Sequence, residues 1–206
     1  MRDETIGDFL SRLADRIPAP GGGAVAALHA AQAAALLGMV ARYSTGEKYA
    51  EHAQAVERII AETGELTSAA LRLAEEDAAA FTAVADAYKL PKDTDEAKAS
   101  RSAAIGQALV GAARPPAEVV AVAQRAVELA EELLPVGNRN VITDIAAATE
   151  AARAAATTAR VNIEINAGGI KDEQARAGLV AQAARVDDIA ARAERVTAAI
   201  REEIGK

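Results

Sequence analysis

The chain has 206 residues, 51% of them hydrophobic but only 2% aromatic, so its core must be built from Ala, Leu, Val and Ile. A formal net charge of -7 with no basic stripe argues against nucleic acid as a partner, and the absence of cysteine excludes disulfides and thiolate sites. The length suits one domain, 1–206, and the N-terminus lacks an apolar signal core, so we expect a cytoplasmic protein.

The first two predicted helices lie on either side of a glycine-rich stretch. Apolar residues recur at three- and four-residue steps over residues 6–17, which predicts an amphipathic helix that Pro18 stops. Residues 25–43 are apolar almost all round, which is typical of a helix at the centre of a bundle. We interpret this segment as a buried helix and not a membrane span, because it is mostly alanine and contains a histidine and a glutamine.

The next segments predict long antiparallel helices. Residues 49–90 form one very long helix or two joined near Gly64, and Pro91 ends this region while Thr94 caps the following helix. That helix runs to Ala113, where "ARPPAE" is expected to break it before a further helix that ends at "LPVGNRN".

The C-terminal third predicts two more helices, roughly 143–166 and 172–203, separated by the glycines of "NAGGIKD". No segment alternates with the period of two that a strand requires. The expected fold is therefore all-α, an antiparallel helical bundle with a long central helix. Its Ala-rich faces favour a homodimer.

The stretch "IPAPGGGAV" places three glycines where the second helix begins. Gly21, Gly23 and Ala26 match the dinucleotide fingerprint G-x-G-x-x-A, but no strand precedes them and no βαβ pattern follows, so we reject that interpretation. Glycines at a helix N-terminus let backbone N–H groups approach an anion or a carbonyl oxygen. We favour this binding role over a simple linker.

Two charged residues stand out in the first half of the chain. Lys48, in "STGEKY", is the only lysine among the first 88 residues, and a lysine at a helix end that faces water is the alternative interpretation. Asp77 lies on the side of its helix that Leu73, Phe81 and Val84 mark as buried. Burial would raise its pKa towards the range useful for acid–base chemistry, although spacing alone favours a solvated or paired acid.

A polar cluster follows in the C-terminal third. Asn162 and Asn166 are one helical turn apart and share a face, so their amides can hydrogen-bond a polar heterocycle. Asn138 and Asp144 lie near the start of the same predicted helix. Spacing alone explains Asp144 as a residue that complements the helix dipole.

Four segments together resemble the cyclodeaminase/cyclohydrolase family of folate one-carbon enzymes: "PAPGGGAVAAL…GMVARYSTGEKY", "DAAAFTAVADAYKLPK", "GNRNVITDIAAATEA" and "ARVNIEIN". They cover nearly the whole chain in the family's order and spacing. The resemblance implies an all-helical protein, dimeric or higher, that binds tetrahydrofolate in a cleft between helices.

The resemblance also assigns residues. The implied catalytic residues are Asp77, Asp144 and Lys48, and the implied substrate-binding residues are Pro20, Gly21, Gly22, Gly23, Asn138, Asn162 and Asn166. The chain departs from the family pattern at Ala24, Thr143 and Ile163, and at His29 and Gln32, where small residues are usual. We interpret His29 as a core histidine, with a pocket group as the alternative.

The implied reaction is hydrolysis of methenyltetrahydrofolate to formyltetrahydrofolate. Asp77 would act as the base or face the cationic substrate, Asp144 would orient water or stabilise positive charge, and Lys48 would polarise or protonate a nitrogen. The resemblance implies no metal and no tightly bound cofactor, with a tetrahydrofolate derivative as substrate. The alternatives are a formimidoyltetrahydrofolate cyclodeaminase, which releases ammonia, and a non-catalytic helical bundle that binds folate or another protein.

Overall fold

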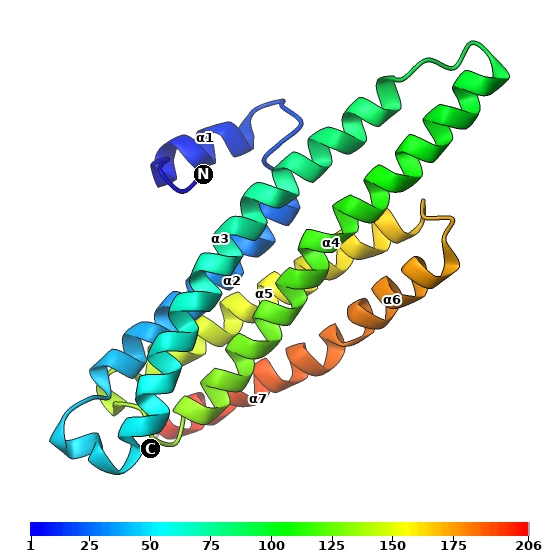
Figure 1. The fold of residues 1–206 in the computed structure, drawn as a ribbon. Helices are drawn as coiled ribbons and strands as arrows, with labels where there is room; N and C mark the ends of the chain where they lie inside the picture. Colours follow the sequence, from blue (N-terminus) through cyan, green and yellow to red (C-terminus); the bar gives the residue numbers. More distant parts are fainter. Residues whose placement is uncertain (206) are drawn as a thin grey trace.

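A computed structural model describes residues 1–205, and all regular structure in that range is helical, as predicted. Figure 1 shows long helices running side by side, with a short N-terminal helix set apart from them. The α-helices are α1 (Ile6–Ala14), α2 (Gly22–Tyr43), α3 (Ala53–Lys89), α4 (Asp95–Leu133), α5 (Ile142–Ala167), α6 (Glu173–Ala184) and α7 (Val186–Ile204), with short 3₁₀ helices η1 (Glu47–His52) and η2 (Arg139–Val141).

Helix α2 is the core of the bundle. It packs against α3 and α5, while α4 packs against the same two helices and α7 covers α5. Twelve of its 22 residues are buried, and most of these are alanines, whose small side chains allow the helices to lie close together. By length and composition α2 could cross a membrane, but 61% of its most apolar window is buried inside the protein, as in the core helix of a soluble protein.

Helices α3 and α4 form a hairpin whose tip projects beyond the other helices (Figure 1). Of the two alternatives for residues 49–90, a single long helix is correct from Ala53 onward, because α3 continues through Gly64. Thr94 caps α4 as predicted, its Oγ1 accepting the N–H of Ala97 at 3.1 Å. The hairpin brings one face of α3 close to the chain entering α2.

The predicted break at "ARPPAE" is wrong, since α4 runs without interruption through Pro115 and Pro116. A proline inside a helix lacks the N–H that would bond to the carbonyl four residues earlier. For Pro116 that carbonyl belongs to Ala112, and the side-chain Nδ2 of Asn166 on α5 donates to it at 3.3 Å. Both prolines are buried, so packing against neighbouring helices offsets the local cost.

Two other boundaries differ from the sequence prediction. Helix α1 ends at Ala14, three residues before the predicted end at Ile17. The last predicted helix, 172–203, is two helices that meet at Arg185, and neither proline nor glycine lies there to signal the break. Helix α1 buries none of its residues, although its apolar side is strongly marked in the sequence.

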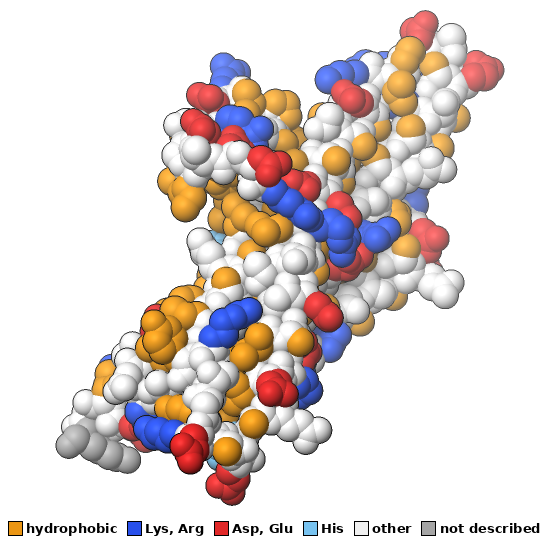
Figure 2. All heavy atoms as spheres, turned by 60° about the vertical axis from the view of Figure 1, so that its left-hand side comes forward, with side chains coloured by type: hydrophobic (Ala, Val, Ile, Leu, Met, Phe, Trp, Pro, Cys, Tyr) orange, Lys and Arg blue, Asp and Glu red, His pale blue; other side chains and the backbone are white. Residues whose placement is uncertain are grey.

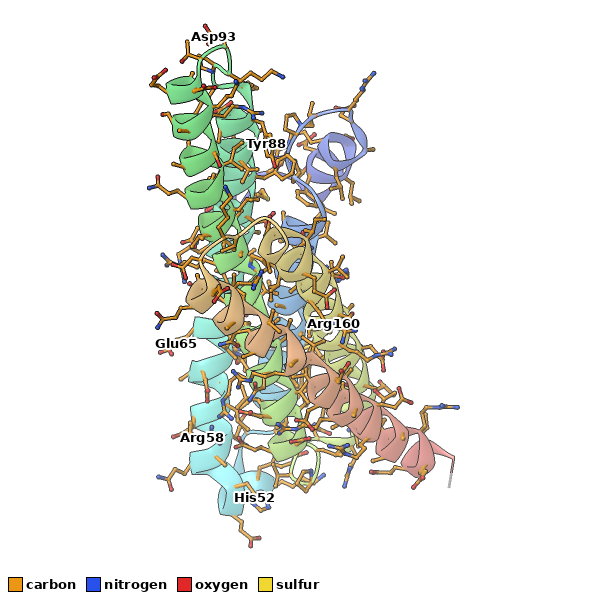
Figure 3. The ribbon with its side chains drawn as sticks, turned by 90° about the vertical axis from the view of Figure 1, so that its right-hand side faces the viewer. His52, Arg58, Glu65, Tyr88, Asp93 and Arg160 are labelled. Atoms are coloured by element: carbon orange, nitrogen blue, oxygen red, sulfur yellow. The ribbon has the colours of Figure 1, made fainter. Side chains whose placement is uncertain are left out.

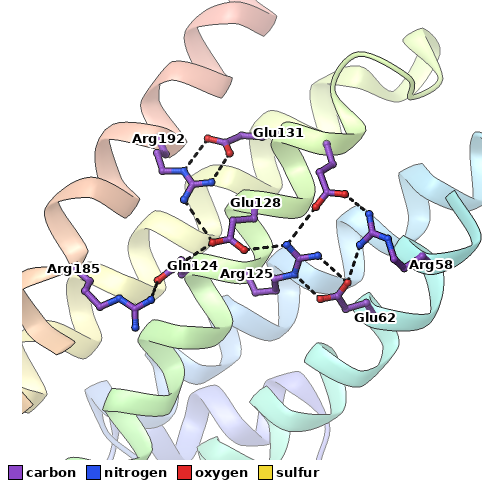
Figure 4. Close-up of polar contacts among 9 residues, drawn as sticks. Arg58, Glu62, Gln124, Arg125, Glu128, Glu131, Arg185 and Arg192 are labelled. Carbon is purple, nitrogen blue, oxygen red and sulfur yellow. Dashed lines mark hydrogen bonds and ion pairs between the residues drawn. The ribbon is translucent and has the colours of Figure 1, made fainter. Parts of the chain in front are cut away.

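An ion-pair network joins α3, α4 and α7 on one side of the bundle (Figure 4). Arg125 at its centre binds Glu62 at 2.5 Å and Glu128 at 3.0 Å. Arg192 extends the network to α7 by pairing with Glu131 at 2.5 Å. The guanidinium of Arg125 is the chief reason why the pKa of Glu62 lies below its usual value.

Candidate active site

A cavity of about 620 Å³ lies where α2 begins, between that end of α2 and the α3–α4 hairpin. We call it the Asp77 cavity. Its walls come from the chain before α2, from α3 and α4, and from the C-terminal end of α5. The residues that line it include Pro20, Gly21, Gly22, Gly23, Asp77, Phe81, Tyr88, Asn162, Asn166 and Gly169. Six of the seven predicted substrate-binding residues and one predicted catalytic residue therefore lie together.

The side chain of Asp77 extends from α3 to the N-terminus of α2, which has no side-chain cap. Gly21 is the N-cap of α2 and makes no side-chain cap hydrogen bond, so the first N–H groups of α2 need other acceptors. The backbone N–H of Ala24 donates to the Asp77 carboxylate, which lowers its pKa, but burial has the larger effect and raises the pKa above its usual value. A carboxylate with a raised pKa is suited to proton transfer.

Gly23 makes this contact possible. A Cβ on Gly23 would lie within 2.6 Å of all three carboxylate atoms of Asp77. Gly22 has more room, since its added Cβ would be 3.9 Å from the nearest atom, Nδ2 of Asn162. The three glycines are therefore not equivalent, and Gly23 is the one that sets how closely Asp77 approaches α2.

The two asparagines of α5 present their side-chain oxygen atoms to the cavity. Asn166 gives both of its amide hydrogens to backbone carbonyls, those of Asn162 at 2.9 Å and Ala112 at 3.3 Å. Asn162 donates to the carbonyl of Thr158 at 2.9 Å. The side-chain oxygens of both asparagines, together with Asp77, form a set of acceptors that suits a ligand with several N–H groups.

Two aromatic side chains of the cavity were missed or misplaced by sequence reasoning. Phe81 was predicted on the buried side of α3, yet it is 50% exposed, and Tyr88 is 53% exposed. Figure 3 places Tyr88 near the free end of the hairpin, opposite the end that carries His52. The signal was present in the sequence, because residues 77, 81, 84 and 88 share one helical face and the chain has only five Phe and Tyr residues.

The other predicted site residues lie at the opposite end of α2. Lys48 is exposed in η1, and its Nζ lies 5.4 Å from the ring centre of Tyr49. Asp144 is in the first turn of α5. Because α2 has 22 residues, its ends are about 30 Å apart, so one chain cannot bring Lys48 or Asp144 to the Asp77 cavity.

Asn138 holds this far end together. Its backbone N–H donates to Ser44 Oγ at 2.8 Å, and its Nδ2 donates to the carbonyl of Tyr43 at 2.9 Å. It also caps η2 by accepting the N–H of Asn140. Within one chain Asn138 therefore joins the end of α2 to the start of α5 and does not reach the Asp77 cavity.

His29 and Gln32 belong to a different hollow. They line a cavity of about 470 Å³ between α1 and the outer side of α2, with Phe9 and Leu13 of α1 opposite. His29 is half-buried and Gln32 exposed, so the expectation that His29 is a core histidine is wrong. Between residues 1 and 205, no group of three or more His, Cys, Asp or Glu side chains is placed to hold a metal ion.

Comparison with known proteins places this geometry in a family. Residues 5–185 match the family model described as formiminotransferase-cyclodeaminase. The methenyltetrahydrofolate cyclohydrolase of Methylorubrum extorquens is 39% identical over 171 residues, which are 82% of each chain. The formimidoyltransferase-cyclodeaminase of Mus musculus is 31% identical over 172 residues, 83% of this chain but 32% of the mouse protein.

A solved structure gives the same result. The formiminotetrahydrofolate cyclodeaminase of Thermotoga maritima superposes with a TM-score of 0.84 at 29% identity, covering 97% of this chain and 98% of that one. The resemblance inferred from the four sequence segments is confirmed. The chain belongs to the formiminotransferase-cyclodeaminase family.

Proposed function

We propose that this protein is a folate one-carbon enzyme that hydrolyses methenyltetrahydrofolate to formyltetrahydrofolate. The observation that carries the proposal is a half-buried carboxylate, Asp77, with a raised pKa, on the wall of a cavity that also presents two asparagine oxygens. The 39% identity to a methenyltetrahydrofolate cyclohydrolase supports this reaction over others in the family. We further propose that the enzyme works in the cytoplasm, with no metal and no tightly bound cofactor.

Asp77 acts as the general base. The methenyl carbon bridges two nitrogens in an amidinium-like cation, and water adds to that carbon while Asp77 accepts a proton from the water. One of the two carbon–nitrogen bonds then breaks: the departing nitrogen takes the proton back from Asp77, the new hydroxyl group releases its own proton to solvent, and the carbon remains on the other nitrogen as a formyl group. The negative charge of Asp77 also stabilises the cationic substrate before attack.

The remaining walls hold the flat pterin ring. Its amino and ring N–H groups match the side-chain oxygens of Asn162 and Asn166, whose amide nitrogens donate to backbone carbonyls. Phe81 and Tyr88 offer aromatic surface against which the ring can stack. The glycines before α2 let the ligand lie against the backbone.

The second candidate reaction is the cyclodeaminase, in which a folate nitrogen attacks a formimino carbon and ammonia leaves. The structural likeness to the cyclodeaminase of Thermotoga maritima favours it. A single experiment separates the candidates: purified protein is given methenyltetrahydrofolate or formiminotetrahydrofolate, and the near-ultraviolet absorbance of the methenyl compound is followed. Loss of absorbance supports the cyclohydrolase, whereas a rise with ammonia release supports the cyclodeaminase. If the absorbance changes with neither compound, the non-catalytic helical bundle is the remaining alternative.

We also propose that the active unit is a homodimer whose subunits meet across α1, α2 and α5. The apolar side of α1 is uncovered, with Ile6 at 80% exposure, and Val161 on α5 is 61% exposed. Figure 2 shows hydrophobic side chains gathered under the lobe that α1 forms and further along the same edge. A second copy related by a two-fold axis offers the same apolar surface in return.

A two-fold axis near the middle of α2 has a further consequence. If the axis is perpendicular to α2, the two α2 helices run antiparallel, and the end of one copy that carries Lys48 and Asp144 lies beside the Asp77 cavity of the other. This arrangement gives both residues the catalytic roles that the family resemblance implies, although one chain keeps them about 30 Å from Asp77. The partner's Asn138 end would lie nearby as well.

The mass in solution tests the dimer. Ala35→Glu places a charge on the exposed side of α2, near the proposed axis, and Ala121→Glu places the same charge on the opposite side, between α4 and α6. We expect light scattering to give a dimeric mass for the wild type and for Ala121→Glu, and a monomeric mass with little turnover for Ala35→Glu. A monomeric, fully active wild type would contradict the proposal.

A further inference from the structure

Two adjacent prolines, Pro115 and Pro116, lie inside α4, and each leaves one backbone carbonyl without its helical N–H partner. Pro115 frees the carbonyl of Gly111, which is exposed, so water can bond to it. Pro116 frees the carbonyl of Ala112, which is buried and lines the Asp77 cavity. The two prolines therefore make the same change to the helix, but Pro116 makes it at the wall of the site.

Helix α5 uses the freed carbonyl of Ala112. Nδ2 of Asn166 donates to it at 3.3 Å, and it also donates to the carbonyl of Asn162, one turn earlier in α5, at 2.9 Å. An amide group that lies against two carbonyl oxygens must present its nitrogen to both, because its own oxygen would be repelled there. The side-chain oxygen of Asn166 is therefore turned away from these carbonyls and remains the acceptor that Asn166 can offer to a ligand.

Helices α4 and α5 are in close contact at this part of the wall. A Cβ added to Gly169, just after α5, would clash with the side chain of Leu109, which lies one turn before Ala112 in α4. Gly169, Leu109, Ala112 and Asn166 all line the Asp77 cavity. Because α5 has little room to move towards α4 here, the direction of the Ala112 carbonyl decides whether Asn166 can bond to it.

An N–H group at position 116 would change that direction. It would draw the Ala112 carbonyl into the regular bond along the helix axis, from residue i to residue i−4. The proline ring has the opposite effect, because it crowds this carbonyl and turns it off the axis. With an N–H at position 116, Asn166 would have to share its acceptor on α4, and the bond to Asn162 would become its main restraint.

We propose that Pro116 is a positioning residue of the active site: it leaves the Ala112 carbonyl to Asn166, and so holds the Asn166 oxygen where N–H groups of the substrate bind. Pro116 does not line the cavity and acts through Asn166. The exchange of hydrogen bonds is a property of the fold. Its effect on the substrate rests on the proposed function, which places a pterin ring against Asn166.

The first experiment is a set of thermal unfolding measurements that needs no substrate. Asn166→Ala leaves the buried Ala112 carbonyl unpaired, and we expect Tm to fall by about 2–4 °C or more in a chain of this length. In a Pro116→Ala background the new N–H pairs with that carbonyl, so Asn166→Ala should lower Tm by about half as much or less. Pro115→Ala is the matched control, because it restores an N–H to Gly111 instead, and the full loss should remain. Equal losses in all three backgrounds would overturn the inference.

The second experiment measures kcat and KM for methenyltetrahydrofolate. Pro116→Ala should raise KM about 2- to 10-fold, the range for one neutral hydrogen bond, with kcat nearly unchanged because Asp77 is untouched. Pro115→Ala should keep the wild-type KM. Added to Asn166→Ala, Pro116→Ala should raise KM no further, because both changes act through one amide. A wild-type KM in Pro116→Ala, or a further rise in the double variant, overturns the positioning role and leaves the proposed function intact.

Two other outcomes are also decisive. If Asn166→Ala does not fold, the KM of Pro116→Ala against that of Pro115→Ala decides the positioning role. Absence of turnover in the wild type would instead overturn the proposed function, and the Kd of formyltetrahydrofolate, measured by calorimetry, then takes the place of KM. Weaker binding by Pro116→Ala than by Pro115→Ala supports the positioning role, and equal binding refutes it.

Discussion

Gly23→Ala tests whether catalysis depends on how closely Asp77 approaches the start of α2. The added Cβ would lie within 2.6 Å of all three carboxylate atoms, whereas ordinary contacts begin at 3.4 Å. The Asp77 side chain must therefore move by roughly an ångström, a displacement that costs a catalytic group about 100-fold in rate. Alanine also favours the helix by about 1 kcal/mol, which roughly offsets the hydrogen bond lost from Ala24 to Asp77.

The assay follows turnover of methenyltetrahydrofolate and thermal unfolding of the same preparations. We expect kcat to fall about 100-fold in Gly23→Ala with little change in Tm. Gly64→Ala is the matched control, because nothing lies within 4 Å of a Cβ at that position in α3. Adding Gly23→Ala to Asp77→Asn should slow the reaction no further, since both changes act through one carboxylate. Wild-type turnover in Gly23→Ala would refute the reasoning.

Three further predictions concern the cavity and its support. Burial raises the pKa of Asp77, so the folded protein binds this proton more tightly than the unfolded chain, and ionisation lowers stability as pH rises from 3.8 through the higher folded pKa. Asp77→Asn should thus be at least as stable as the wild type at neutral pH in denaturant titrations, and a clear loss of stability would mark Asp77 as mainly a helix cap. Phe81→Leu should raise KM about 2- to 10-fold with a smaller effect on kcat, and an unchanged KM would remove Phe81 from the binding surface. Arg125→Gln should lower the free energy of unfolding by about 1–2 kcal/mol, with the difference shrinking in high salt, and a salt-independent loss would point to packing instead.

Local patterns in the sequence were sufficient for most of the helices. The spacing of apolar residues and caps such as Thr94 act within a few residues, so they can be recognised without knowing the fold. The position of Asp77 on the inward side of α3 follows from the same 3.6-residue period. The continuity of α4 does not, because the carbonyl freed by Pro116 is satisfied by Asn166, 54 residues from Ala112.

The composition of the site was predicted only in part. The glycines, Asp77, Asn162 and Asn166 meet because α2 and α5 run antiparallel, with the start of one beside the end of the other. The same topology puts Lys48 and Asp144 at the other end of α2. The length of α2 could have predicted this separation, because a helix of 22 residues spans about 30 Å. Phe81 was assigned to the core because large apolar residues on an inward face are usually buried, and the cavity is the exception.

The central claim is that Asp77 is the base for hydrolysis of methenyltetrahydrofolate. The most direct measurement is the rate at which the near-ultraviolet absorbance of that compound decays at neutral pH with wild type and with Asp77→Asn, which keeps an oxygen to accept the Ala24 N–H but loses the charge. We predict rapid decay with the wild type and a rate lower by about 10²- to 10⁴-fold with a folded Asp77→Asn protein. Equal rates for the two proteins, or a wild-type rate no faster than buffer alone, would contradict the claim.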